Sequence, residues 1–153
     1  MIRVLVIEDG YEYIENLQRF MGEGFFLGRA GSGPEALERL GAKEWDVILM
    51  DMCFDRCPIL LGESPELLGR LGGEPGRVRM HLEQHQGTYI LAAIRDAGHH
   101  IPVVFSYDFD AEPRRFSNLL KRYAPVSYLD DVAGPPEFRK MMIGMVKESS
   151  ASQ

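Results

Sequence analysis

Short continuous runs of apolar residues restrict the folds that are open to this sequence. Val4–Ile7 and Val47–Met50 are two such runs, and neither alternates with polar residues. A run without alternation is typical of a strand that is buried on both faces, as in a parallel sheet. Similar short runs occur at Phe25–Leu27, Ile101–Phe105 and Val126–Leu129. The sequence therefore predicts five strands in one parallel sheet.

Segments with helical periodicity separate these runs. Apolar residues at three- and four-residue spacing predict an amphipathic helix over residues 11–21. Ser32 and Glu35 form a capping-box pattern that opens a second helix. Further helices are predicted over residues 112–123 and after Pro135. Strands that alternate with helices indicate βαβ units, so the predicted fold class is α/β with a doubly wound parallel sheet.

One stretch, residues 52–86, contains no strand pattern. A Ser-Pro-Glu start and a Gly-Gly stop predict a short helix over Pro65–Leu71, and an apolar stripe predicts a long helix over Arg77–Asp96. Because its leucines need burial, we expect this stretch to be ordered and packed on the body. The predicted organisation is one domain, residues 1–148, with a helical insertion at about 52–86 and a flexible tail at 149–153.

Charge and composition exclude several classes of protein. Lys and Arg number 17 and Asp and Glu 23, a net charge of −6, which argues against a nucleic-acid domain driven by bulk charge. The apolar runs are too short to span a bilayer, and the first residues lack the pattern of a signal peptide. Two cysteines do not make a disulfide framework. We expect a soluble cytoplasmic protein without a nucleic-acid or membrane partner.

Acidic residues follow two of the predicted strands directly. Glu8 and Asp9 come after the first strand, and Asp51 comes after the third. Ligands bind at the carboxyl edge of a parallel sheet, so these carboxylates are expected to converge there. Their mutual repulsion favours a hard cation such as Mg²⁺. An aspartate beside such a cation can attack phosphorus and form an aspartyl phosphate. The alternative is that the three acids are ordinary strand-end and turn residues.

These segments carry a family resemblance. Val4–Asp9, Trp45–Met52 and Ile101–Phe105 together resemble the receiver domain of two-component response regulators. The resemblance implies a five-stranded sheet of order 2-1-3-4-5 with helices on both faces, here with the insertion between strand three and helix three. Gly87 matches the glycine that opens the third helix of the family.

The resemblance also assigns roles at the acid cluster. It implies that Asp51 is the phosphoacceptor and that Glu8 and Asp9 bind Mg²⁺. The backbone carbonyl of Cys53 would complete the protein ligands. The metal would then be held by Glu8, Asp9, Asp51 and Cys53.

Other family positions are altered in this sequence. The switch Ser/Thr position after strand four falls on Tyr107 when counted without a gap, or on Ser106 if the strand end is one residue shorter. Tyr128 fits the aromatic switch position. The position of the family's lysine holds Asp131, so an anion replaces the cation that would balance a phosphoryl group. Arg56 is a candidate substitute for that cation, against an ordinary surface arginine.

The insertion contains a second candidate metal site. Cys53 and Cys57 are four residues apart, as are His81 and His85, and two cysteines with two histidines could hold tetrahedral zinc. The alternative is a buried cysteine pair and two surface histidines.

The sequence thus leaves two mechanisms open for one leading function. The resemblance implies an atypical single-domain bacterial response regulator. It either accepts a phosphoryl group on Asp51 with Mg²⁺, or acts as a pseudo-receiver that binds partner proteins without phosphorylation. The expected partner is a sensor kinase or another signalling protein, and the chain is not expected to be an enzyme. The alternative from another class is a small phosphotransferase or phosphohydrolase that uses Asp51. The oligomeric state stays open.

Overall fold

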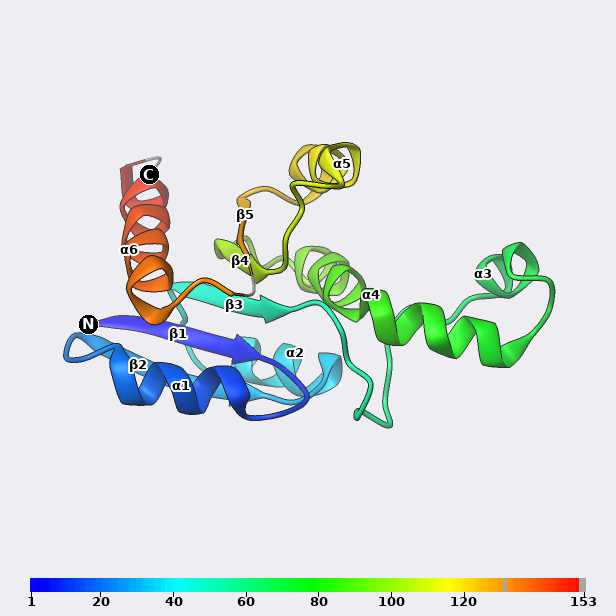
Figure 1. The fold of residues 1–153 in the computed structure, drawn as a ribbon, viewed down its shortest axis with the longest axis horizontal. Helices are drawn as coiled ribbons and strands as arrows, with labels where there is room; N and C mark the ends of the chain where they lie inside the picture. Colours follow the sequence, from blue (N-terminus) through cyan, green and yellow to red (C-terminus); the bar gives the residue numbers. More distant parts are fainter. Residues whose placement is uncertain (131, 152–153) are drawn as a thin grey trace.

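The computed structural model describes residues 1–130 and 132–151, and it contains one five-stranded, all-parallel sheet (Figure 1). The strands are β1 (Ile2–Ile7), β2 (Phe25–Ala30), β3 (Val47–Asp51), β4 (Val103–Ser106) and β5 (Val126–Leu129). Their order is β2-β1-β3-β4-β5, which confirms the predicted topology.

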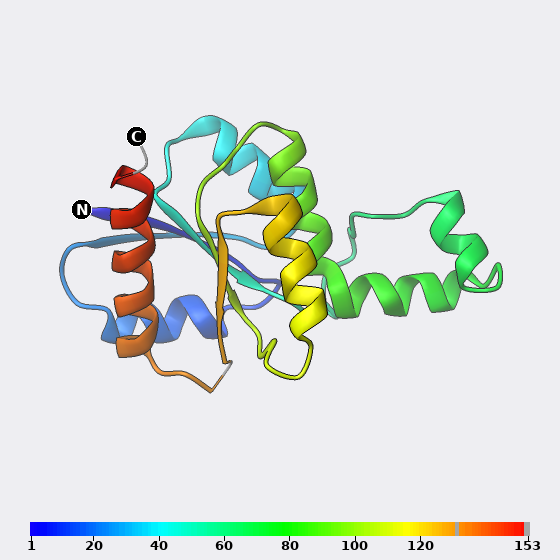
Figure 2. The same ribbon diagram turned by 90° about the horizontal axis from the view of Figure 1, so that it is seen from above.

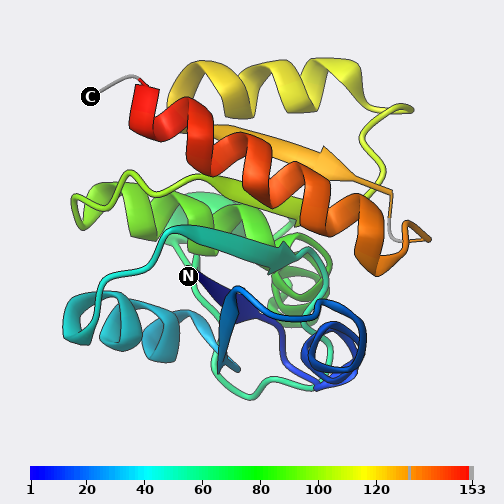
Figure 3. The same ribbon diagram turned by 90° about the vertical axis from the view of Figure 1, so that its left-hand side faces the viewer.

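Helices cover both faces of the sheet. They are α1 (Glu12–Phe20), α2 (Gly33–Ala42), α3 (Pro65–Arg70), α4 (Pro75–Asp96), α5 (Pro113–Tyr123) and α6 (Pro135–Ala151). Side chains of α1 and α6 share one buried cluster, and side chains of α2, α4 and α5 share the other. Figure 3 shows α6 running past the strands of the sheet. None of the helices among the described residues is long and apolar enough to cross a membrane.

The carboxyl ends of three strands meet at one edge of the sheet. Ile7 at the end of β1 pairs with Met50 of β3, and Asp51 pairs with Ser106, the last residue of β4. Paired residues of parallel strands project from the same face, so this register places Asp51 and Ser106 side by side. The predicted acid edge is therefore formed by the ends of β1 and β3, with β4 beside them.

The C-terminal segment differs from the sequence prediction. Helix α6 continues to Ala151, into the segment that we expected to be a flexible tail. The reason is that Ser149 and Ser150 bring neither a glycine nor a proline that would end the helix. Residues 152–153 lie outside the described part of the chain.

The insertion forms an arm that projects from the body (Figure 2). Both predicted helices are present, α3 with Ser64 as its N-cap and α4 starting two residues before the predicted position. Leu67 of α3 packs with Val78 and Leu82 of α4 in a small separate cluster. The expectation that this helix packs on the body is therefore wrong: α3 packs on α4, and other apolar side chains of the arm, among them Ile59 and Leu68, remain exposed.

Helix α4 bends where it meets the body, as Figure 2 shows. The N–H group of Gly87 donates to the carbonyl of Met52 at 3.0 Å, and the Glu83 carbonyl accepts from the N–H group of Phe54 at 2.7 Å. Two groups from the interior of α4 are thus bonded to the chain that follows β3. A Cβ atom on Gly87 would lie 2.4 Å from the carbonyl oxygen of Asp51. Only glycine allows this approach, so Gly87 fixes α4 against the end of β3.

Gly87→Ala should therefore destabilise the fold, although alanine favours helices. We expect a loss of about 1–3 kcal/mol in the free energy of unfolding, because the backbone of Asp51 has no room to move away from the methyl group. Gly144→Ala in α6 is the matched control, since a Cβ atom there meets nothing within 4 Å. The Gly144→Ala variant should gain about 0.5–1 kcal/mol in the free energy of unfolding. Urea unfolding measures both, and equal gains in the two variants would contradict the close approach.

Candidate acidic phosphoacceptor site

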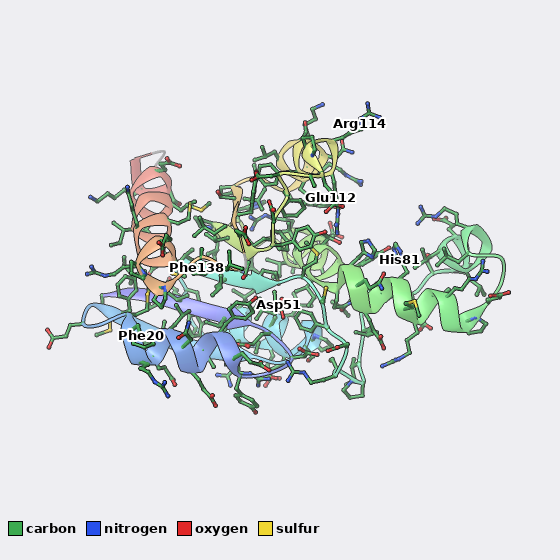
Figure 4. All side chains as sticks on the ribbon, in the orientation of Figure 1. Phe20, Asp51, His81, Glu112, Arg114 and Phe138 are labelled. Carbon is green, nitrogen blue, oxygen red and sulfur yellow. The ribbon has the colours of Figure 1, made fainter. Side chains whose placement is uncertain are left out.

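Asp51 ends β3 as a half-buried residue, and Figure 4 marks its position. Its Oδ1 accepts a hydrogen bond from the N–H group of Met52 at 2.9 Å. Loss of solvation, together with the negative charges of Asp9 and Glu8, raises the pKa of Asp51 to about 7, although backbone hydrogen bonds from Met52 and Cys53 oppose the shift. The three acids are therefore close enough to interact, as the sequence predicted. No ion pair to Asp51 is found within residues 1–130 and 132–151.

Asp9 is engaged by the loop that follows β3. Its side chain is only 2% exposed. Asp9 Oδ2 accepts from the N–H group of Arg56 at 2.7 Å, and the Arg56 guanidinium lies 3.6 Å from Oδ1. The same guanidinium pairs with Glu12 at 2.8 Å. Arg56 thus lies at the acid edge, but its charge is directed to Asp9 and Glu12.

Glu8 has a structural role that the sequence analysis missed. Its two carboxylate oxygens accept from the N–H groups of Tyr13 at 3.1 Å and Ile14 at 2.8 Å. Glu8 therefore caps the first turn of α1, whose N-cap residue Tyr11 makes no side-chain cap bond. Burial raises the pKa of Glu8, and the two backbone hydrogen bonds oppose that effect. The signal was the position of Glu8 just before the helix, although its spacing from Tyr13 and Ile14 is not that of a standard capping box.

The raised pKa of the half-buried Asp51 carboxyl predicts a dependence of stability on pH in metal-free buffer. With its folded-state pKa raised to about 7, Asp51 keeps a proton that the unfolded chain releases near its ordinary pKa. This contribution is fully present below the unfolded pKa and is lost as the pH rises through about 7. Asp51→Asn should remove the loss and be more stable than the parent chain at about pH 8.

Urea unfolding in EDTA at about pH 5 and about pH 8 measures this effect. Asp55→Asn is the control, because the Asp55 side chain is 77% exposed. We expect the parent chain to lose stability relative to Asp51→Asn when the pH is raised from about 5 to about 8. A gain in its stability relative to the variant over the same range would contradict a raised pKa for Asp51.

The two candidates for the switch hydroxyl differ in their surroundings. The Ser106 side chain belongs to a residue only 3% exposed, and among the described atoms its hydroxyl has no hydrogen-bond partner. Tyr107 donates its hydroxyl to Glu112 and accepts from Nη1 of Arg115 at 3.3 Å. Ser106 is thus the free hydroxyl beside Asp51, whereas the hydroxyl of Tyr107 is held at the start of α5.

The two remaining switch positions lie on and after β5. The Tyr128 ring packs on Phe109 and Phe116, and its hydroxyl donates to Asp110 at 2.6 Å. It therefore faces the loop before α5. Asp131, at the position of the family's lysine, lies outside the described residues, so its relation to the site stays a prediction.

The zinc hypothesis is wrong. Within the described residues, no group of three or more His, Cys, Asp or Glu side chains is arranged to hold a metal ion. The Cys53 thiol contacts the Gln84 carbonyl at 3.6 Å, whereas the Cys57 thiol is buried and bonds to the Ile59 carbonyl. His81 and His85 stack on each other, and both are half-buried. The two histidines line a cleft with side chains of α5 and form no metal-holding group with the cysteines, which spacing alone could not reveal.

The residues at the acid edge fit Mg²⁺ differently. Magnesium needs only one or two carboxylates, with water and other oxygens completing its shell. Asp51 is a half-buried carboxylate whose pKa is raised by loss of solvation and by the negative charges of Asp9 and Glu8. The absence of a three-carboxylate group in the described residues is compatible with such a site.

Comparison with solved structures identifies the fold. The chain is similar to the receiver domain of a Francisella response regulator, with a TM-score of 0.67 and 17% identity over 97% of this chain and 99% of that one. A CheY-like receiver domain protein from Methanospirillum hungatei gives a TM-score of 0.66 at 13% identity, over 100% and 99%. The chain has the receiver-domain fold. A Clostridium thermocellum receiver domain matches at 16% identity over the full length of both chains, with a TM-score of 0.65.

The receiver-domain fold is the extent of this likeness. No protein-family model matches the sequence, and no curated protein matches it at a significant level. With NtrX from Brucella abortus the match covers 99% of this chain but 28% of that one, at a TM-score of 0.70. At these identities the likeness shows the fold alone, so the roles of Asp51 and its neighbours must be argued from their own surroundings.

Proposed function

We propose that this chain is a receiver-type signalling domain that accepts a phosphoryl group on Asp51 in the presence of Mg²⁺. The observation that carries the proposal is the half-buried Asp51 carboxylate, which has no ion-pair partner among the described residues and lies beside the unpartnered hydroxyl of Ser106. An anion that is partly removed from water is costly unless a cation offsets its charge. The Mg²⁺ of a phosphoacceptor site would supply that cation.

Magnesium would be held by Asp51 and Asp9 and by the backbone carbonyl of Cys53. Glu8 is a weaker candidate ligand, because both of its oxygens already accept from α1. When bound, the ion would offset the charges of the acids and of the incoming phosphoryl oxygens. Ser106 would then donate its hydroxyl to a phosphoryl oxygen, which would give this buried group a partner.

The transfer itself needs only Asp51 and a phosphoryl donor. A carboxylate oxygen of Asp51 attacks the phosphorus of acetyl phosphate, the bond from phosphorus to the acetate oxygen breaks, and acetate leaves. The product is an acyl phosphate on Asp51. The carboxylate must be deprotonated to attack, which the raised pKa opposes and a bound cation favours.

The partners of such a domain would be a sensor kinase and a protein that reads the phosphorylated state. This proposal has a direct test in solution. The full chain is incubated with acetyl phosphate and Mg²⁺, and its intact mass is measured. One added phosphoryl group supports the proposal. An unchanged mass in saturating Mg²⁺ would support the pseudo-receiver, and turnover of p-nitrophenyl phosphate would support the phosphohydrolase.

A further inference from the structure

A basic cleft lies between α4 and α5, away from Asp51. Its volume is about 290 Å³, and it is lined by side chains from α3, α4 and α5. Five of these are basic: Arg70, His81, His85, Arg115 and Arg122. No lining residue among those described is an aspartate or a glutamate. This is unexpected in a chain with a net charge of −6.

The arginines of the cleft are poorly neutralised. Within the described part of the chain, neither Arg70 nor Arg122 forms an ion pair, and Arg122 lies 5.4 Å from the ring centre of Tyr123. Arg115 pairs with Glu112 at 3.3 Å, but that carboxylate also accepts from Tyr107. Of these three guanidinium groups from two helices, only that of Arg115 has an ion-pair partner among the described residues.

The two histidines add further hydrogen-bond donors to the arginines of the cleft. Their rings stack with centres 4.3 Å apart. His85 Nδ1 lies 2.8 Å from the His81 carbonyl, which can only accept, so Nδ1 carries the proton and Nε2 has no hydrogen-bond partner among the described residues. His81 Nε2 is 3.0 Å from the Tyr89 hydroxyl. Burial lowers the pKa of His81, and the positive charges of His85, Arg70 and Arg115 lower it further.

We propose that this cleft binds a small phosphate-bearing molecule. Guanidinium groups match phosphate oxygens in pairs, and several cations around one cavity favour an anion with more than one charge. Thr88 and Asn118 supply further hydrogen-bonding groups at its wall. The volume is at the low end for small-molecule sites, which suits one or two phosphate groups rather than a large ligand.

The site is independent of the proposed phosphoacceptor. Its histidines belong to the arm and its arginines mainly to α5, so a bound anion would join the arm to the body. None of its lining residues is an acid of the β1 and β3 edge.

The test uses the full chain and inorganic diphosphate in magnesium-free buffer, measured by calorimetry. We expect saturable binding at one site that weakens as salt is added. Arg122→Gln and Arg70→Gln should each weaken binding about tenfold or more, since each removes a charged hydrogen-bond donor. Arg114→Gln is the matched control, because Arg114 is exposed on the same helix but does not line the cleft (Figure 4).

A histidine NMR titration gives a second measurement. The groups that face His81 are Arg70 from α3, His85 and Tyr89 from α4, and Arg115 from α5, with Glu112 behind Arg115. Diphosphate should raise the pKa of His81, because the anion offsets the cations around it. Asp51→Asn should leave both results unchanged. Absence of saturation, or equal weakening in Arg114→Gln and Arg122→Gln, would overturn the proposal whatever happens at Asp51.

Discussion

Asp51→Asn should abolish incorporation of a phosphoryl group from acetyl phosphate. Asparagine keeps the shape of the side chain and its hydrogen bond from Met52, but it lacks the nucleophilic carboxylate. Because Asp51 is the proposed site of attack, the loss should be complete rather than partial. Intact-mass measurement after incubation with Mg²⁺ and acetyl phosphate shows the label directly.

Two further variants locate the chemistry. Asp55→Asn changes an exposed carboxylate in the loop after β3 and should be labelled like the parent chain. Ser106→Ala removes the unpartnered hydroxyl, so it should slow labelling without preventing it. Persistent labelling of Asp51→Asn would place the acceptor at another residue.

Arg95→Leu should give the largest loss of stability of any single change considered for this chain. Arg95 is 8% exposed, and its guanidinium donates to four backbone carbonyls within 3.0 Å. These belong to Tyr123, His99, Ile101 and Pro125, so one side chain ties the end of α4 to the segments that lead into β4 and β5. Burial lowers the pKa of Arg95 to about 10, which still leaves it charged at neutral pH.

Leucine would fill similar space but leave the four carbonyl oxygens without their donor. Each unsatisfied buried group costs about 1–3 kcal/mol, and some would regain water, so we expect a total loss of about 3–4 kcal/mol. Arg95→Lys should recover only part of it, because a single ammonium group cannot reach all four oxygens. Arg114→Leu on the exposed side of α5 should change stability by less than about 0.5 kcal/mol. Urea unfolding measures the free energy of unfolding of the parent chain and of the three variants. An equal free energy of unfolding for Arg95→Leu and Arg114→Leu would contradict this account.

The fold and the acid edge could be predicted because they depend on local pattern and on chain order. Val4–Ile7 and Val47–Met50 are fully apolar because both faces of β1 and β3 are covered, and burial selects such residues directly. Glu8, Asp9 and Asp51 follow these strands, and parallel strands end at a common edge. The helices of the insertion were predictable from Ser64 and from the apolar stripe of α4 for the same reason.

What could not be predicted depends on contacts between distant residues. Arg56 and Glu12 are 44 positions apart, and nothing in their local sequence indicates that they pair. The bend at Gly87 needs the carbonyl of Met52 beside α4, and periodicity alone predicts a straight helix there. His81 and His85 suggested zinc by spacing, whereas the cations of α3 and α5 give them a different environment. In each case the partner lies on another element of the fold.

The central claim is that Asp51 and its neighbours form a pocket for Mg²⁺ and a phosphoryl group. The most direct measurement is a thermal-shift titration of the parent chain with fluoroberyllate, a phosphoryl mimic, with and without Mg²⁺. We predict a saturable rise in Tm that requires both components and is absent in Asp51→Asn, because the mimic needs the carboxylate and the metal. An unchanged Tm in the parent chain with both components, or the same rise in Asp51→Asn, would contradict the claim.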